Sequence, residues 1–272
     1  MRSRLEAWLL EDLGSYDLTT EVLGIGGLRG VAQLFAREEA VVAGSEEAAE
    51  VYRLAGCGEV EVVKRSGQLA RRGNVVLRAV GEARCLHAAW RTAQEVVAWA
   101  SGVATKTRRL VELARRVNPR VVVAATRKTP PGLRALYHKA VLAGGGMVHR
   151  CCLSDGVLVF RNHLVFLGDG ALQKAARAVA VRPAGVEVST VEEAVEAAKA
   201  GFSYIQLERM TPEEVAEAAA RIRAVNPRVV VGASGGIDEH NIASYAPHVD
   251  VVVTSAPYRA PPIDLGTEMA PL

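Results

Sequence analysis

The stretch NPRVVVAATRKT, residues 118–129, decides the fold of this chain, because it returns as NPRVVVGASGGI at residues 226–237. Each copy follows a segment with helical spacing, residues 106–117 and residues 215–225, and each places three valines before a polar loop. A short valine run bounded by turn residues is typical of a buried strand in a parallel sheet. Two copies of helix, turn, strand and loop therefore indicate a repeating β/α architecture.

Further β/α units are expected between and after the two copies. Counting them gives about six or seven short parallel strands, which favours a barrel of the (β/α) type over a flat open sheet. Chemistry in such barrels sits where strands end and loops begin. The additional strands are expected at residues 157–160, 186–189, 204–207 and 249–254, and the additional helices over 170–179 and 191–200.

The first hundred residues predict a separate, mixed α/β region. A helix is expected over Ser45–Ala55, with Ser45 as its N-cap and Gly56 ending it. A second helix over Cys85–Ala100 is expected to lead into a new region that begins near Ser101. The strands of this first region are expected at residues 31–36, 59–64 and 75–80.

Composition narrows the class of protein. The chain has 272 residues, of which 50% are hydrophobic and 23% charged, and its formal net charge is +3. Such a small charge, with acids and bases interleaved, excludes a general nucleic-acid-binding protein. The opening Met1–Glu6 does not resemble a signal peptide, and no apolar run is long enough for a membrane span, so we expect a cytoplasmic protein without a membrane partner.

The four cysteines have neither the spacing of metal ligands nor the density of a disulfide framework. They are Cys57, Cys85, Cys151 and Cys152. The adjacent Cys151 and Cys152 are interpreted as small residues packed beside a strand, because free cysteine behaves as a buried hydrophobe.

Cations cluster after the first valine run. Arg127 and Lys128 follow it directly, beside Thr126, and His149 and Arg150 follow three glycines. A guanidinium can hold a carboxylate or phosphate through two parallel hydrogen bonds, and an ammonium can act beside it as a movable point charge. The pattern predicts an anion-binding active site, although an isolated cation pair would more often be a solvated surface feature.

The second valine run and the last strand end in small residues suited to a phosphate. Ser234, Gly235 and Gly236 close one strand, and Ser255 and Ala256 close the other, where barrels commonly bind a terminal phosphate. Two acids stand at other strand ends, Glu187 and Glu208, and could bind sugar hydroxyls or Mg²⁺. The alternative for these acids is a structural pairing with neighbouring arginines.

These motifs, in this order, resemble the quinolinate phosphoribosyltransferase family (nicotinate-nucleotide pyrophosphorylase, carboxylating). The resemblance spans nearly the whole chain. It rests on Asp17-Leu18-Thr19-Thr20, Ala43-Gly44, Trp90-Arg91-Thr92-Ala93, Ser101-Gly102-Val103-Ala104-Thr105, Thr126-Arg127-Lys128-Thr129 with Pro131-Gly132, Gly144-Gly145-Gly146 with His149-Arg150, Asn162-His163 and Ala233-Ser234-Gly235-Gly236-Ile237.

Membership would imply an N-terminal α/β sandwich domain over residues 1–102 and a C-terminal open (β/α) barrel over residues 103–259. The tail, 260–272, would pack on the first domain. It would also imply a homodimer, or a dimer-based higher oligomer, in which Arg91 crosses to complete the partner's active site. The catalytic residues would then be Arg91, Arg127, Lys128, His149, Arg150, Glu187 and Glu208. The 5-phosphate would be bound by Ser234, Gly235, Gly236, Ser255 and Ala256. Mg²⁺ would be bound by Glu187 and Glu208.

The chain departs from the family where substrate is bound. The family's active-site lysine is Phe160 here, and Arg161 or Lys139 could restore the missing charge from a neighbouring position. The pairs around Phe160 and the ending Ser255-Ala256-Pro257-Tyr258 look more like the ModD branch, a group found with molybdate-transport genes. An aromatic in place of a cation favours an acceptor with less negative charge than a dicarboxylate, or one that stacks.

The leading hypothesis is transfer of a phosphoribosyl group from phosphoribosyl pyrophosphate, with Mg²⁺, to a ring nitrogen of quinolinate or a similar small aromatic acid. Thr126, Lys139, Phe160 and Arg161 would join the substrate-binding residues. The alternatives are a ModD-like pyrophosphorylase with another acceptor, a barrel enzyme acting on a different sugar phosphate, and a non-catalytic protein that binds an anion or nucleotide.

Overall fold

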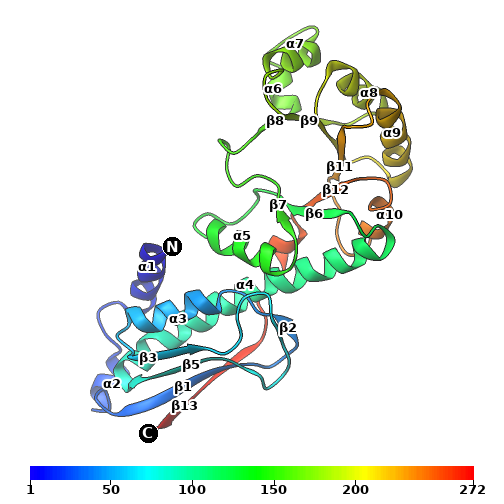
Figure 1. Cartoon of the computed structure of the whole chain (residues 1–272). Helices are drawn as coiled ribbons and strands as arrows, with labels where there is room; N and C mark the ends of the chain where they lie inside the picture. Colours follow the sequence, from blue (N-terminus) through cyan, green and yellow to red (C-terminus); the bar gives the residue numbers. More distant parts are fainter. The chain divides into compact units, whose positions relative to one another are not determined.

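The chain forms two main β-sheets in a computed structural model that describes residues 1–272. The sheets belong to two units (Figure 1), and each unit is discontinuous in sequence. The first unit comprises residues 1–108, 129–145 and 257–272, and the second comprises residues 109–128 and 146–256.

The first unit is built on an antiparallel sheet. Strand β1 (Arg29–Ala36) pairs with β5 (Val75–Glu82) on one side and with β13 (Leu265–Pro271) on the other, so the end of the chain is an edge strand here. Strand β3 (Glu59–Val62) completes the order β13-β1-β5-β3. Beside the sheet are a two-stranded pair, β2 (Ala40–Val41) and β4 (Leu69–Ala70), and the helices α1 (Arg2–Leu13), α2 (Leu18–Val22) and α3 (Ser45–Leu54).

Helix α3 lies against this sheet and is amphipathic, with Ala48, Val51 and Tyr52 buried in the core of the unit (Figure 1). The predicted N-cap at Ser45 was wrong. Gly44 occupies the cap position in the left-handed region, φ +82°, and Ser45 is already helical. A side chain at Gly44 would also meet the backbone of Val96 at 3.0 Å, so the position requires glycine on both counts.

One helix of 35 residues, α4 (Ala83–Val117), replaces the two helices predicted over 85–100 and 106–117. The new region that was expected to begin near Ser101 therefore begins inside a continuous helix, and the glycine at 102 has a packing role. A Cβ at Gly102 would lie 2.1 Å from the carbonyl oxygen of Pro261, so glycine admits the returning C-terminal segment against the helix. The first part of α4 packs in the core of the first unit, through residues such as Leu86 and Ala93.

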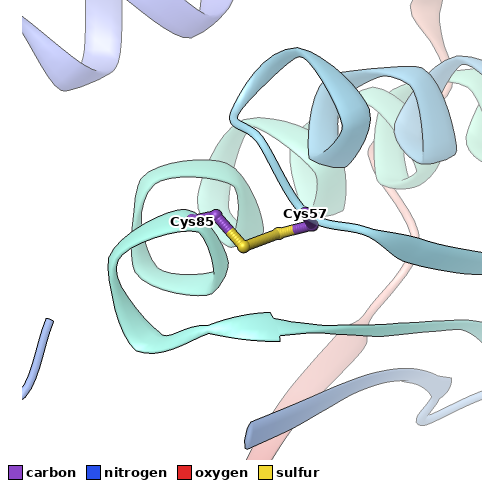
Figure 2. Close-up of a disulfide and its surroundings, with 2 residues drawn as sticks. All are labelled: Cys57 and Cys85. Atoms are coloured by element: carbon purple, nitrogen blue, oxygen red, sulfur yellow. A yellow bond between two sulfur atoms is a disulfide. The ribbon is translucent and has the colours of Figure 1, made fainter. Parts of the chain in front are cut away.

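A disulfide joins Cys57, just after α3, to Cys85, in the first turn of α4 (Figure 2). The sequence did not predict this bond. Gly81 makes room for it, since a Cβ there would come within 2.5 Å of the sulfur of Cys85. The interpretation of Cys151 and Cys152 as packed residues was also wrong, because both are free and exposed.

The segment 129–145 carries helix α5 (Arg134–Ala143) and belongs to the first unit. Gly144 ends this helix and packs on α4, where a Cβ would meet the Ala104 carbonyl oxygen at 2.5 Å. Arg108 holds the same turn by donating from Nε to the Gly144 carbonyl, 3.0 Å away. The first glycine of the 144–146 run therefore ends and packs a helix.

The second unit contains a seven-stranded parallel sheet in the order β7-β6-β12-β11-β10-β9-β8. No pairing joins β7 to β8, so the barrel remains open. Each strand is short. Six of the seven overlap a strand range expected from the sequence, and the exception is β7. The strands are β6 (Val122–Ala125), β7 (Met147–Val148), β8 (Val157–Val159), β9 (Ala184–Val188), β10 (Tyr204–Glu208), β11 (Val230–Ser234) and β12 (Val251–Thr254).

Helices cover the outside of this sheet (Figure 1). Apolar residues of α8 (Val191–Ala200) and α9 (Pro212–Val225) pack with the strands in one core that includes Val186, Ile205 and Val231. Shorter elements complete the unit: α6 (Arg161–Leu164), α7 (Ala171–Ala178) and α10 (Ile242–Tyr245), while the 3₁₀ turn η1 (Ala256–Arg259) follows the last strand. The predicted fold class, an N-terminal α/β domain plus an open C-terminal (β/α) barrel, is confirmed. None of the helices combines the length and apolar character that crossing a bilayer requires.

Candidate active site

The predicted site residues of the second unit stand at the C-terminal ends of its parallel strands. All seven strands contribute, and because the strands are parallel these ends share one edge of the sheet. In sheet order the residues are His149 and Arg150 after β7, Thr126, Arg127 and Lys128 after β6, Ser255 and Ala256 after β12, Ser234, Gly235 and Gly236 at β11, Glu208 at β10, Glu187 in β9, and Phe160 and Arg161 after β8.

Two guanidinium groups, those of Arg127 and Arg150, form the cationic part of the site. Arg150 is buried, with 9% of its surface exposed, and donates from one terminal nitrogen to the carbonyl oxygen of Gly156 at 3.0 Å. Burial and the nearby positive charge of Arg127 lower the pKa of Arg150. Arg127 has its Nε atom buried without a hydrogen-bond partner. Two neighbouring cations of like charge, one of them with a buried donor atom that has no partner, are suited to receive an anion.

Lys128 and Thr126 support this cluster. The Lys128 side chain is exposed, and its backbone nitrogen donates to the hydroxyl of Thr126 at 3.3 Å. Thr126 itself is fixed by a backbone hydrogen bond of 3.1 Å to Thr254 on the neighbouring strand. Lys128 thus has a defined backbone position and an exposed side chain, an arrangement that suits a cation acting as a point charge on a flexible stem.

Phe160 extends the site with an aromatic surface. Its ring stacks on His163, with centroids 5.5 Å apart, and the guanidinium carbon of Arg150 lies 5.4 Å from the ring centroid. That geometry is a cation–π contact, so Phe160 is packed against the cation cluster and does not replace its charge. Arg161, the predicted substitute cation, is exposed and opens the short helix α6.

Two carboxylates face this cluster from adjacent strands. Burial, and then the negative charge of Glu208, raise the pKa of Glu187, while a hydrogen bond from Gln206 and the charges of Lys128 and Arg209 act in the opposite direction. A pair of neighbouring carboxylates is a donor set that a divalent cation can bind, and Mg²⁺ commonly uses one or two carboxylates together with substrate phosphates. Glu187 and Glu208 fit that description.

Another acidic group lies outside the predicted set. Asp238, Glu239 and His240 bring their side chains within 4.8 Å of one another in the turn after the SGG motif. They are consecutive, partly exposed residues, and Asp238 also accepts a backbone hydrogen bond from His240. Such acidic groups are common on protein surfaces without a bound ion, and these three residues form part of a turn.

Strand β10 ends in an unusual backbone turn. Arg209 has φ +56°, and it is the one non-glycine residue with a positive φ. Gly235 permits this turn, because a Cβ there would lie 2.8 Å from the Arg209 backbone nitrogen. Glu208 is fixed in the same region by the Ser234 hydroxyl, which donates to it, and by the side chain of Arg209 at 3.5 Å. A left-handed residue held by its surroundings at a strand end is typical of a functional site.

Some of the small residues predicted to hold a phosphate already make hydrogen bonds within the chain. Ser234 is hydrogen-bonded to Glu208, and the backbone nitrogen of Ala256 donates to Thr254 at 3.0 Å. Gly236 has φ +74° with open space where a side chain would be. The helix that follows these glycines, α10, begins only at Ile242, since Asp238–Asn241 form a turn.

A chain of side-chain hydrogen bonds, which the sequence did not reveal, links both halves of the site. His149 Nε2 lies 3.3 Å from the hydroxyl of Tyr204, and that hydroxyl donates to Gln206 Oε1 at 3.0 Å. Gln206 Nε2 donates to Glu187 Oε2 at 2.7 Å. Burial, and secondly the charge of Arg150, lower the pKa of His149. Gly185, just before a predicted strand, and Gly232, just after the second valine run, were the available sequence signal for this arrangement.

Two predicted site residues belong to the first unit. Arg91 is exposed on α4, with its guanidinium 4.1 Å from the ring centroid of Trp90. Lys139 on α5 is held by Glu46 at 2.9 Å and Glu47 at 2.7 Å. Burial acts to lower the pKa of Lys139, but hydrogen bonds to both acids raise it. The ammonium of Lys139 is therefore neutralised within its own unit.

Comparison with known proteins finds matches to a single family over both parts of the chain. The family model described as quinolinate phosphoribosyl transferase, N-terminal domain, matches residues 17–101, and the model for the C-terminal domain matches residues 103–268. A Rhodobacter capsulatus protein provisionally named pyrophosphorylase ModD is 42% identical over 245 residues, covering 88% of this chain and 93% of its own.

More distant relatives carry the other name used in this family. A Methanothermobacter thermautotrophicus protein provisionally named nicotinate-nucleotide pyrophosphorylase (carboxylating) is 36% identical over 268 residues, 95% of each chain. Among solved structures, NadC from Streptococcus pyogenes superposes with a TM-score of 0.89 at 32% identity, covering 98% of this chain and 95% of that one.

Proposed function

The chain belongs to the quinolinate phosphoribosyltransferase family, and on that premise we propose that it transfers a 5-phosphoribosyl group from phosphoribosyl pyrophosphate to a ring nitrogen of a small aromatic acid. The observation that carries this proposal is the pair of cations Arg127, with its Nε atom buried, and Arg150, a buried residue, near the carboxylates of Glu187 and Glu208. Cations suit pyrophosphate and a carboxylate, and anions suit a ribose whose C1 becomes positive.

In the reaction, the bond between ribose C1 and the pyrophosphate oxygen breaks, and a bond between C1 and the acceptor nitrogen forms. Arg127, Lys128 and Arg150 stabilise the departing pyrophosphate, and His149 hydrogen-bonds the anion. Glu187 and Glu208 lie on the ribose side, where their charge stabilises an oxocarbenium-like C1. Ser234, Gly235, Gly236, Ser255 and Ala256 bind the 5-phosphate, with Thr126 fixing the cation-bearing loop. No covalent nucleophile is required.

Mg²⁺ is the proposed cofactor, with Glu187 and Glu208 as its protein ligands. When bound, it would add positive charge to the pyrophosphate of the donor and so assist its departure. The raised pKa of Glu187 beside Glu208 supports this assignment, because a divalent cation relieves the repulsion between the two acids.

The acceptor divides two candidate functions. Quinolinate, a dicarboxylate, would feed NAD synthesis, and the names of the Methanothermobacter relative and of similar proteins point in that direction. The aromatic ring of Phe160 against Arg150 favours a second candidate, an acceptor with fewer carboxylates that lies against the ring, and the ModD-named relatives support it. Lys139, paired with Glu46 and Glu47, adds no net charge to help a dicarboxylate bind.

We further propose a homodimer in which Arg91 of one subunit completes the site of the other. The exposed guanidinium of Arg91 supports this role, because its one ion pair within the chain, with Glu95 at 3.9 Å, is long, and its other contact is with the ring of Trp90. A cytoplasmic location is also proposed, although the Cys57–Cys85 disulfide is a feature more common in oxidising compartments.

The test is release of pyrophosphate from phosphoribosyl pyrophosphate and Mg²⁺, with quinolinate, nicotinate and related heterocyclic acids offered one at a time. We expect release with at least one acceptor, and a loss of about 10²–10³-fold in Lys128→Ala. Lys174→Ala, an exposed lysine on α7, is the matched control and should turn over normally. Release that is unaffected by Lys128→Ala would contradict the proposed site.

Phe160→Lys separates the two candidate acceptors. If Phe160 selects against a second carboxylate, the lysine variant gains turnover with quinolinate relative to monocarboxylates. A preference for quinolinate that is already present in the wild type, and that does not change in the variant, would reject the second candidate.

A further inference from the structure

We propose that Tyr204 is a positioning residue whose hydroxyl fixes the proton of His149 on Nε2 and, through Gln206, holds the carboxylate of Glu187. This inference rests on the proposed function only for its effect on turnover. Its structural content stands on three contacts: 3.3 Å from His149 to Tyr204, 3.0 Å from Tyr204 to Gln206 and 2.7 Å from Gln206 to Glu187.

These contacts cross the interior of the open barrel. Tyr204 begins β10, whereas His149 follows β7, and three strands of the sheet lie between those two. The His149 and Tyr204 rings are also in contact, with centroids 5.4 Å apart. Gln206 and Glu187 are partners in the register of β10 and β9. One hydroxyl thus joins the anion-binding side of the proposed site to its acidic side.

Glycines on both neighbouring strands create the space for the tyrosine. A Cβ at Gly232 on β11 would lie 2.3 Å from the Tyr204 hydroxyl oxygen, and a Cβ at Gly185 on β9 would lie 2.6 Å from its ring. Neither glycine has a positive φ, so each position requires glycine for close approach. Any larger residue at 232 would occupy the place of the hydroxyl.

The direction of each hydrogen bond in this chain follows from the carboxylate of Glu187 at one end. The ionised carboxylate of Glu187 can only accept, which turns the amide nitrogen of Gln206 toward it and leaves Oε1 to accept from Tyr204. Having donated its one proton to Gln206, the Tyr204 hydroxyl can only accept from His149. His149 must therefore carry a proton on Nε2, and Nδ1 is left as the nitrogen that can take up a further proton when an anion binds.

The first test needs no substrate. In protein labelled with ¹⁵N-histidine, the nitrogen shifts of the six histidines distinguish a protonated ring nitrogen from one with a lone pair, and His149→Gln assigns the signal. Above about pH 8, where histidine is neutral, we expect His149 to be protonated on Nε2. A proton on Nδ1 in the wild type would overturn the proposal, whatever the enzyme's activity.

Two variants separate positioning from packing. Tyr204→Phe keeps the ring and removes the hydroxyl, so His149 should become a mixture of tautomers, and turnover should fall about tenfold if the proposed function holds. Gln206→Met removes the acceptor from Tyr204, whose hydroxyl then donates to Nε2 and moves the His149 proton to Nδ1.

Tyr245→Phe is the matched control, because it removes another tyrosine hydroxyl bond of the second unit, the one to the Met210 carbonyl at 3.2 Å. The His149 signals should be unchanged in this variant. If Tyr204→Phe also leaves them unchanged in a folded protein, Tyr204 does not fix the tautomer. A normal tautomer pattern in an inactive protein would instead count against the proposed function.

Discussion

Arg127→Met is expected to stabilise the protein while it abolishes most of the activity. The Nε atom of Arg127 is buried without a hydrogen-bond partner, and its charge adds to that of Arg150, lowering the pKa of the latter. An unpaired buried donor costs about 1–3 kcal/mol. Methionine fills a similar volume without a polar atom, so the free energy of unfolding should rise by about 1 kcal/mol, which raises the melting temperature by ~2 °C.

The same change removes a donor that the departing pyrophosphate would require. Loss of one such electrostatic contact typically costs about 10²–10³-fold in turnover, or roughly 3–4 kcal/mol of transition-state stabilisation. Arg127→Met should therefore raise the stability and lower the activity. The unpaired donor of Arg127 destabilises the free protein, but it stabilises the complex when an anion is bound.

The assay pairs thermal unfolding with pyrophosphate release. Arg177→Met, which removes an exposed arginine from α7, is the control and should leave both nearly unchanged. In the wild type, added inorganic pyrophosphate should raise the melting temperature, and Arg127→Met should abolish most of that rise. The reasoning would be refuted by an Arg127→Met protein that is several degrees less stable and turns over normally.

Three further changes act outside that cluster. Reducing the disulfide between Cys57 and Cys85, 28 residues apart, should lower the free energy of unfolding by about 3 kcal/mol, measured by denaturant titration with and without reductant; equal midpoints would contradict this. The second change concerns Glu46. Burial alone would raise the pKa of this carboxyl, but hydrogen bonds, including one from Lys139, lower it from 4.5 to about 2. Stability should therefore be lost as the pH falls from about 4.5 toward 2, less steeply in Lys139→Met, and identical slopes would exclude the contact. Gly232→Ala, by crowding the barrel interior, should cost about 1–3 kcal/mol in the same titration; an unaltered midpoint would show that the interior adapts.

The strand ends could be predicted because their signals are local. A valine run followed by Thr126, Arg127 and Lys128, or by Ser234 and two glycines, identifies a buried strand and the polar loop at its carboxyl end. Parallel topology then brings such loops to one edge without any knowledge of side-chain contacts.

The hydrogen-bond chain through Tyr204 could not be predicted in the same way. It depends on the curvature of the sheet, which brings a residue after β7 against the first residue of β10. Glycines at 185 and 232 marked a close approach, but the sequence does not say which side chain fills the space. The disulfide was missed for a related reason, since two cysteines pair by distance in the fold, 5.4 Å between Cα atoms, and not by spacing in the chain.

The continuity of α4 was not predicted. Separate helices were expected over residues 85–100 and 106–117, with a new region beginning near Ser101. In the structure one helix runs through this point, and Gly102 contacts Pro261 where any side chain would collide. A tertiary contact, absent from local sequence, decided the position.

The measurement that tests the central claim most directly is pyrophosphate release from phosphoribosyl pyrophosphate and Mg²⁺ in the presence of single heterocyclic acids, by wild type and Arg127→Met. The account predicts acceptor-dependent release by the wild type and a loss of about 10²–10³-fold in the variant. Absence of release with every acceptor, or equal release by the two proteins, would contradict it.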